Sequence, residues 1–241
     1  MRILPLGLLI PLAACGMGGS DDDDRAGIPA NGSGGTRSYA VADFTTVEQR
    51  GPDDVDVRVG SGFSVRAEGE PDVLDRVKII HDGKRLRITR VRSGFSWSSG
   101  AAKIYVTMPR IEAASLAGAG DIAIDRIDGA AFVGDIAGAG SLSLGRVVVE
   151  SLRLSIAGSG NVAAAGEARS FSVSIAGSGD VDAAKLRAAT ANVKIAGSGS
   201  VRAAVDGDAK VSIMGAGDVD LGPKARCDVE KMGAGEVRCG G

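Results

Sequence analysis

The sequence is poor in aromatic residues, which make up 3 % of its 241 residues. A compact globule of this size usually fills its core with more large rings, whereas a narrow core of stacked Ile, Val, Leu and Ala does not need them. Histidine is also scarce, because His81, beside a turn signal, is the only one. We therefore expect neither a Ser-His-Asp triad nor a histidine metal cluster.

The sequence has no large excess of either charge, since it contains 28 Lys and Arg residues and 30 Asp and Glu residues. Most basic residues are spread singly, and nucleic-acid binding needs a clustered basic face. The exception is the run from Lys84 to Arg92, which we interpret as the solvated face of a hairpin, with a binding patch as the alternative. The sequence therefore predicts no nucleic-acid partner.

Long apolar runs are missing, and residues 3–14 are too short to span a membrane as a permanent helix. One positive charge, Arg2, precedes this run and small residues follow it, which is typical of a secretory signal. The end, Leu12-Ala13-Ala14-Cys15, resembles a bacterial lipoprotein lipobox. The resemblance implies a signal peptide at residues 1–14 and lipidation of Cys15. The alternative is an ordinary secreted protein that loses Cys15 with its signal.

The residues after Cys15 predict a tether. Gly16 favours export to the outer membrane, because an aspartate at this position of Gram-negative lipoproteins often directs retention in the inner membrane. Residues 15–37 are rich in Gly and Ser, and they carry four adjacent, mutually repelling aspartates, Asp21–Asp24. We interpret this segment as a flexible, lipidated tether, with weak cation binding by the aspartates as the alternative.

Glycine is abundant, with 37 residues, and much of it recurs in register. Seven Gly-x-Gly phrases begin at Gly118, Gly138, Gly158, Gly177, Gly197, Gly215 and Gly233, in steps of 20, 20, 19, 20, 18 and 18 residues. A fixed period near 20 predicts stacked structural units, that is, a solenoid. The glycines should stand at sharp corners, with positive φ or close approach between coils.

Aligning the repeats on Gly-x-Gly reveals aliphatic columns. The column two residues before the first glycine contains Leu116, Ile136, Ile156, Ile175, Ile195, Ile213 and Lys231. The column two residues after the second glycine contains Ile122, Leu142, Val162, Val181, Val201, Val219 and Val237. Because strand side chains alternate and parallel crossovers are right-handed, the pattern predicts an all-β fold. It is a right-handed parallel β-helix with 18–20 residues per coil, whose last coil meets water at Lys231.

The expected domain is a single β-helix over residues 38–241. Its repeats occupy residues 111–241, each with a strand, a corner, a second strand and a variable loop or third strand. Residues 38–110 form a less regular entry part. We expect the entry part to contain strands near 55–59, 63–67 and 103–109, a helical turn within 71–77, a hairpin around Asp82-Gly83 and a Gly/Ser-rich loop at 93–102.

Two cysteines fall in the repeat register. Cys227 aligns with Phe132, Leu152, Phe171, Ala191 and Ala209, and Cys239 aligns with Ile124, Leu144, Ala164, Ala183, Ala203 and Leu221. In most coils a large residue in one column accompanies a small one in the other, which indicates that the columns face each other. Since disulfides persist in exported proteins, we predict a Cys227–Cys239 disulfide in the final coil.

The glycine phrases do not predict a nucleotide site, because none continues into Lys-Ser/Thr and no helix follows. They loosely resemble calcium-binding nonapeptide repeats, but the period is near 20. An acidic residue follows the second glycine only at Asp121, Asp180, Asp218 and Glu236. A calcium ladder remains the alternative, and we expect no metal and no cofactor.

Enzymes of β-helix architecture that cleave acidic polysaccharides gather Asp, Arg or Lys from neighbouring coils. The candidates are Asp180, Asp182, Asp218 and Asp220. However, Asp182, Arg202, Asp220 and Arg238 form one column of alternating sign, which predicts inter-coil charge pairs of roughly 0.2–1 kcal/mol each. We therefore expect no catalytic residues. Phe95, Trp97 and Tyr105 are candidates for stacking on sugars, or, for a loop Trp, for covering the open end of the helix.

The stretch from about Asp43 to Cys239 resembles the bacterial auto-transporter adhesin head GIN domain family. The resemblance rests on the entry Asp43–Val47, on Val106-Thr107-Met108-Pro109 and on the phrase Ile-Ala-Gly-Ser-Gly-Asp-Val at Ile175–Val181. It implies an exported β-solenoid of uncertain role, without catalytic residues to carry over.

We therefore expect a non-enzymatic, lipid-anchored envelope protein that presents a β-helix surface for binding or adhesion. Its partner would be a polysaccharide, another envelope protein or a host surface. The alternative is a carbohydrate-active lyase or hydrolase. A groove rich in Asp and Arg over three adjacent coils would favour the enzyme, and a flat wall of small residues would favour binding.

Overall fold

The computed structural model describes residues 25–91 and 100–240, which are almost entirely β-structure. Cys15, Asp21–Asp24, Phe95 and Trp97 lie outside the described residues. The N-terminal elements are β1 (Ala30–Asn31), β2 (Thr36–Tyr39), β3 (Thr46–Gly51), β4 (Asp54–Val59), β5 (Ser64–Glu68), α1 (Pro71–Leu74), β6 (Val77–Asp82), β7 (Arg85–Arg90) and β8 (Lys103–Met108). The remaining strands are β9 (Ala113–Gly118), β10 (Ile122–Gly138), β11 (Ser141–Gly158), β12 (Asn161–Gly177), β13 (Asp180–Gly197), β14 (Ser200–Val205), β15 (Asp208–Gly215), β16 (Asp218–Asp220), β17 (Arg226–Gly233) and β18 (Val237–Arg238).

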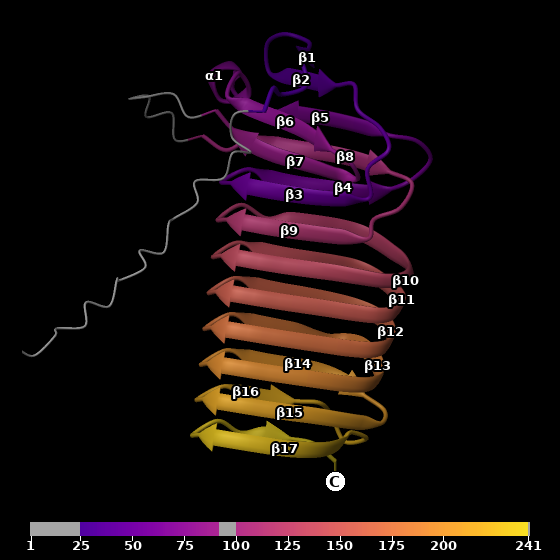
Figure 1. Ribbon diagram of the computed structural model, residues 1–241, viewed down its shortest axis with the longest axis vertical. Coiled ribbons are helices and arrows are strands. Elements are labelled where there is room, and N and C mark those ends of the chain that lie inside the picture. The colour runs from indigo at the N-terminus through magenta and orange to yellow at the C-terminus, as the bar shows by residue number, and fades with distance from the viewer. Residues whose placement is uncertain (1–24, 92–99, 241) are drawn as a thin grey trace, which may run out of the picture.

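The predicted solenoid is confirmed. From β9 to β18 each coil pairs in parallel with the next, and successive corner glycines such as Gly138 and Gly158 are register partners. The front strands in Figure 1 point left while the chain descends, so the winding is right-handed. Seven corners bound six full turns. The expected variable loop is absent from β10 to β13, where one bent strand of 17 or 18 residues runs between corners.

The corner glycines are required for two separate reasons. The first glycine of a phrase has positive φ, as in Gly197 with a φ of 139°, which side-chain-bearing residues avoid. The second glycine lies against the coil before it: a Cβ on Gly199 would stand 2.1 Å from the carbonyl oxygen of Gly179. The period in the sequence is therefore the period of backbone contacts between coils.

The core is the stack of aliphatic columns. In the column that ends at Lys231, the six other residues are at most 2 % exposed, and Ile175 is 1 % exposed. Phe132 and Phe171 are fully buried in this core. With so few rings, burial of branched aliphatic side chains supplies most of the hydrophobic stabilisation.

The entry part contains solenoid coils that the sequence period does not show. Gly51 is the register partner of Gly118, and Val55 on β4 pairs with Ile122, so β3 and β4 form a coil directly above the first repeat. Strands β7 and β8 stack in parallel on β3 and β4. The solenoid therefore extends above the repeats into residues 38–110.

Asp53 replaces the second glycine of the phrase in this coil. It is fully buried, and its carboxylate accepts hydrogen bonds from Arg90 at 2.9 and 2.5 Å and from the Ala102 amide at 2.8 Å. Arg87 is also buried, and its Nε donates a hydrogen bond of 3.1 Å to the Glu48 carboxylate. The interpretation of the Lys84–Arg92 run as a solvated hairpin face is therefore wrong for Arg87 and Arg90, which face buried carboxylates.

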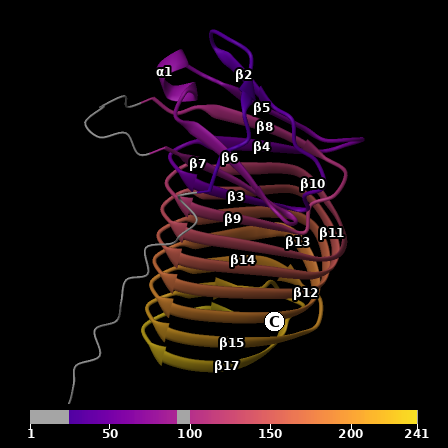
Figure 2. The same ribbon diagram turned by 45° about the horizontal axis from the view of Figure 1, so that its top comes forward.

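Antiparallel strands close the N-terminal end. Strands β6 and β7 form the predicted hairpin, with Gly83-Lys84 as its turn. Strand β5 pairs antiparallel with β8, and β2 pairs with β5. Figure 2 shows these strands and α1 lying across the top of the coils. Because α1 has four residues, no described helix is long enough to cross a membrane.

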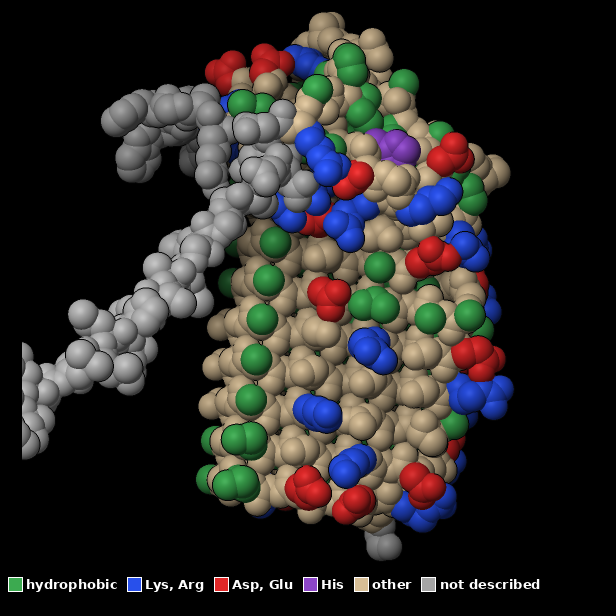
Figure 3. All heavy atoms as spheres, viewed as in Figure 1, with side chains coloured by type: hydrophobic (Ala, Val, Ile, Leu, Met, Phe, Trp, Pro, Cys, Tyr) green, Lys and Arg blue, Asp and Glu red, His purple; other side chains and the backbone are tan. Residues whose placement is uncertain are grey.

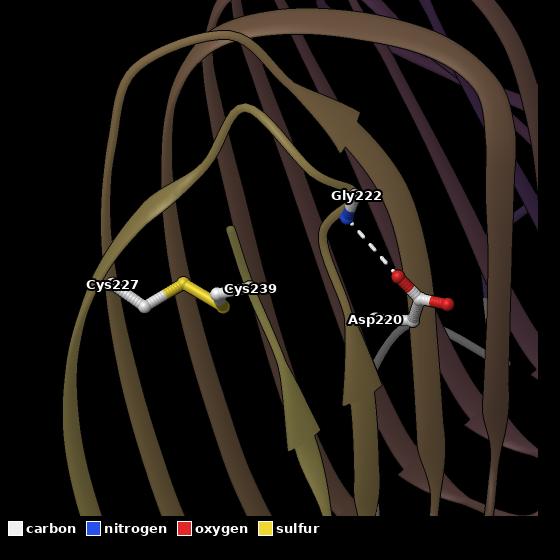
Figure 4. The surroundings of a disulfide bond; sticks show 4 residues. All are labelled: Asp220, Gly222, Cys227 and Cys239. Atoms are coloured by element: carbon white, nitrogen blue, oxygen red, sulfur yellow. Dashed lines mark hydrogen bonds between the residues drawn. A yellow bond between two sulfur atoms is a disulfide. The ribbon is translucent and has the colours of Figure 1, made fainter. Parts of the chain in front are cut away.

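The C-terminal end is held by the predicted disulfide. Cys227 on β17 is bonded to Cys239 just after β18, with their Cα atoms 6.0 Å apart (Figure 4). Both residues pack against the core from below. The bond confirms that the two cysteine columns face each other across the solenoid.

Candidate functional site

A polar face begins directly after each corner, on the arc formed by β4, the first parts of β10 to β13, β14, β16 and β18. Side-chain oxygens on one coil accept hydrogen bonds from backbone amides of the next. The donor and acceptor pairs are Asp121 to Asp54 at 3.0 Å, Ser141 to Asp121 at 2.8 Å, Asp180 to Asn161 at 3.3 Å, Ser200 to Asp180 at 2.8 Å and Glu236 to Asp218 at 2.8 Å. We call this set the corner ladder.

The corner ladder gives the predicted candidates Asp180 and Asp218 a structural role. One oxygen of Asp180 accepts both the backbone amide and the hydroxyl of Ser200, the latter at 2.7 Å. These contacts supply hydrogen bonds between coils at the point where the corner interrupts the strands. In residues 25–91 and 100–240, no three His, Cys, Asp or Glu side chains are grouped to hold a metal ion.

The other predicted candidates form an outward column beside the corner ladder. Asp182, Arg202, Asp220 and Arg238 are successive register partners. Their predicted charge pairs are not formed. Asp182 accepts the Ala184 amide at 3.2 Å, Asp220 accepts the Gly222 amide at 3.0 Å (Figure 4), and Arg238 pairs with Glu236 at 3.0 Å. Each carboxylate finds a nearer donor on its own chain segment.

Arg202 is left without a partner among the described residues, between two aspartates that are themselves occupied. Its side chain is exposed. It therefore lies on the polar face with donors available to an incoming ligand.

Two hollows follow the polar face across the coils. One, of about 460 Å³, is lined by Ser141, Ser143, Asn161, Val162, Ala163, Asp180, Val181, Asp182, Ser200 and Arg202. The second, of about 320 Å³, is lined by Ser200, Val201, Arg202, Asp218, Val219, Asp220, Glu236 and Arg238. They share Ser200 and Arg202, so the two hollows adjoin, and together they are lined by hydroxyl, amide and charged groups.

A third hollow lies at the opposite corner, where the coils change length. It has a volume of about 530 Å³, and Glu150, Glu167, Arg169, Arg187 and Asp206 stand among its lining residues. The hydrogen bond and charge of Arg169 lower the pKa of Glu150. Sequence reasoning missed this hollow, because its columns mix charged residues with small apolar ones, as Val148, Glu167 and Arg187 do, and so carry no aliphatic pattern.

Tyr105 is the one predicted stacking residue within the described ranges. The Arg66 guanidinium lies 4.8 Å from its ring centroid and the Lys103 ammonium 5.6 Å. The ring is on β8, three coils above Ser143 in the same outward column, because Tyr105, Asp56, Ala123 and Ser143 are successive register partners. Existing cation–π contacts occupy it.

Comparison with known proteins gives one family and several structures. The family described as "Putative auto-transporter adhesin, head GIN domain" matches residues 43–225. The fold is similar to that of a putative adhesin from Bacteroides fragilis, with a TM-score of 0.75 and 18 % identity, over 85 % of this chain and 95 % of that one. A search of curated proteins gives no match.

Two structures from Parabacteroides distasonis are also similar. One is a putative adhesin with a TM-score of 0.68 and 17 % identity, over 87 % of this chain and 98 % of that one. The other is named a putative lipid binding protein, with a TM-score of 0.61 and 19 % identity over the same shares. At these identities the likeness concerns the fold alone.

Proposed function

Because the chain belongs to the auto-transporter adhesin head GIN domain family, we propose that it is a non-enzymatic, lipid-anchored envelope protein that binds a polysaccharide along its polar face. The observation that carries the proposal is the pair of adjoining hollows, which lie along the coils from β11 to β18. Coils of a parallel β-structure repeat every 4.8 Å or so. A polymer of similar units can therefore meet similar hydroxyl, amide and charged groups at successive coils.

The engagement of the carboxylates fixes their orientation, because a backbone amide holds one oxygen of each candidate aspartate and leaves the other as an acceptor. Asp180 and Asp218 direct oxygens to backbone amides of the next coil, and Asp182 and Asp220 direct theirs to amides on their own segment. Held in this way, they are rigid acceptors for sugar hydroxyls, which suits recognition.

Replacing Arg202 with alanine is expected to weaken polysaccharide binding about tenfold, because a charge-assisted hydrogen bond contributes roughly 1.5–3 kcal/mol. The measurement is retention of envelope polysaccharide fractions by the immobilised chain lacking residues 1–15. Arg153→Ala is the matched control, since Arg153 is also exposed but lies on the front strands, before the next corner. If both variants weaken polysaccharide binding equally, or if neither weakens it, the polar face is not the binding surface.

The anchor is tested at Cys15. Cys15→Ser is expected to abolish incorporation of a labelled fatty acid, because the thiol is the proposed attachment point. Gly16→Asp is the control and should keep the label, while shifting the protein toward the inner membrane in fractionated envelopes. Equal label in wild type and Cys15→Ser would rule out the anchor.

A further inference from the structure

The two ends of the solenoid differ in their open strand edges. The N-terminal end is covered by antiparallel strands and α1, whereas within residues 25–91 and 100–240 β17 pairs with β15 on one side only. A strand with one free edge presents unpaired backbone N–H and C=O groups, to which another strand can add. The C-terminal end is therefore where a further strand can be added to this fold.

Exposed apolar side chains gather at the same end. Of the five large apolar residues exposed within the described ranges, three lie on the last two coils: Met214 at 60 %, Val229 at 42 % and Met232 at 73 %. Val229 continues a core column whose member above it, Val211, is fully buried. A strand added below β17 would cover Val229 and complete its column, whereas Met214 and Met232 alternate with the inward residues and lie on the outward face of β15 and β17.

Lys231 opposes such an addition. Lys231 continues an inward column. Its register partner on the coil above is Ile213, which is 1 % exposed. Its ammonium donates to the Gly235 carbonyl at 2.7 Å, beneath the core. Asp228 and Glu230 lie on the same strand, and Figure 3 shows acidic side chains on the lowest coil.

We propose that the C-terminal end is a latent self-association surface and that Lys231 keeps it closed. The partner that it fits is the C-terminal end of a second copy, because the covered N-terminal end leaves β17 only another β17 to pair with. Such a two-fold contact is isologous, so it would enclose two ammonium groups at once. Burying unpaired charges is unfavourable, so we expect wild-type protein to stay monomeric at this end.

The test is the oligomeric state of the chain lacking residues 1–15, measured by sedimentation over a concentration series. Lys231→Ile is expected to form a dimer at least tenfold tighter than any wild-type association. Lys210→Ile is the matched control: it makes the same chemical change on the exposed face of β15 and should remain monomeric. Lys231→Met, which keeps the length of the side chain, is expected to dimerise if the isoleucine variant does not fold.

The location is tested by returning a charge to the same edge. Adding Val229→Lys to Lys231→Ile should restore the monomer, since Val229 is the neighbouring core-column residue on β17. The proposal is overturned if folded Lys231 variants stay monomeric, if wild type dimerises equally, if Lys210→Ile dimerises alike, or if the double variant remains a dimer.

Discussion

Replacing Ile175 with aspartate is expected to lower the free energy of unfolding by more than about 4 kcal/mol. Ile175 is 1 % exposed, and it lies between Ile156 and Ile195 in the middle of the solenoid. An aspartate there would bury a charge with no partner, or a carboxylic acid without its hydrogen bonds. Thermal unfolding followed by circular dichroism should show a midpoint lower by roughly 10 °C or more.

Ser174→Asp is the control for this variant. Ser174 precedes Ile175 on β12 but points outward, beside Lys194 of the next coil. The same new carboxylate should therefore change the midpoint little. If Ile175→Asp melts within a degree or two of wild type, the inward assignment of the column is wrong.

Replacing Gly197 with alanine is expected to destabilise the fold by more than about 2 kcal/mol, since an unfavourable backbone conformation alone costs 1–3 kcal/mol or so. Gly197 has a φ of 139°, and a Cβ would stand 2.0 Å from the Gly177 carbonyl oxygen and 2.9 Å from its carbon. Both obstacles involve backbone, which cannot rotate aside. Each coil is stabilised by its contacts with the neighbouring coils. Chemical denaturation of Gly197→Ala should therefore show a lower midpoint than that of wild type.

Ser198→Ala tests the neighbouring position of the same corner. Ser198 is exposed, and alanine stands at the equivalent position in four other phrases, at Ala119, Ala139, Ala216 and Ala234. Its effect should stay within about 0.5 kcal/mol. Equal stability of Gly197→Ala and Ser198→Ala would contradict the close packing of corners.

The repeats could be predicted because one physical constraint recurs in each coil. Close backbone approach demands glycine, and the inward positions demand aliphatic residues, so both appear as columns. The coil around Gly51 escaped detection because its register partner Gly118 is 67 residues away, beyond β5 to β8. In the Gly51 coil, Asp53, bonded to Arg90, replaces the second glycine. A long-range ion pair of this kind has no local signature.

The polar face could be predicted only in part. The columns of Asp180 and Asp182 were visible, but their partners were not. A short aspartate side chain reaches a backbone amide on the next coil or two residues along more easily than a distant guanidinium. Glu150 and Arg169 each stand eight residues before the next corner, so an alignment on the corners does bring them together. Their column gives no pattern, because it holds Ala130, Ala189, Gly207 and Ala225 elsewhere.

The central claim, binding without catalysis, is tested most directly by following the length of a retained polysaccharide. The fraction that the chain captures is incubated with excess protein, and its size distribution and new chain ends are measured over time. The account predicts a bound polymer of unchanged length, with capture reduced in Arg202→Ala. Progressive shortening by wild type, abolished in Asp180→Asn or Asp182→Asn, would contradict it and favour the enzyme.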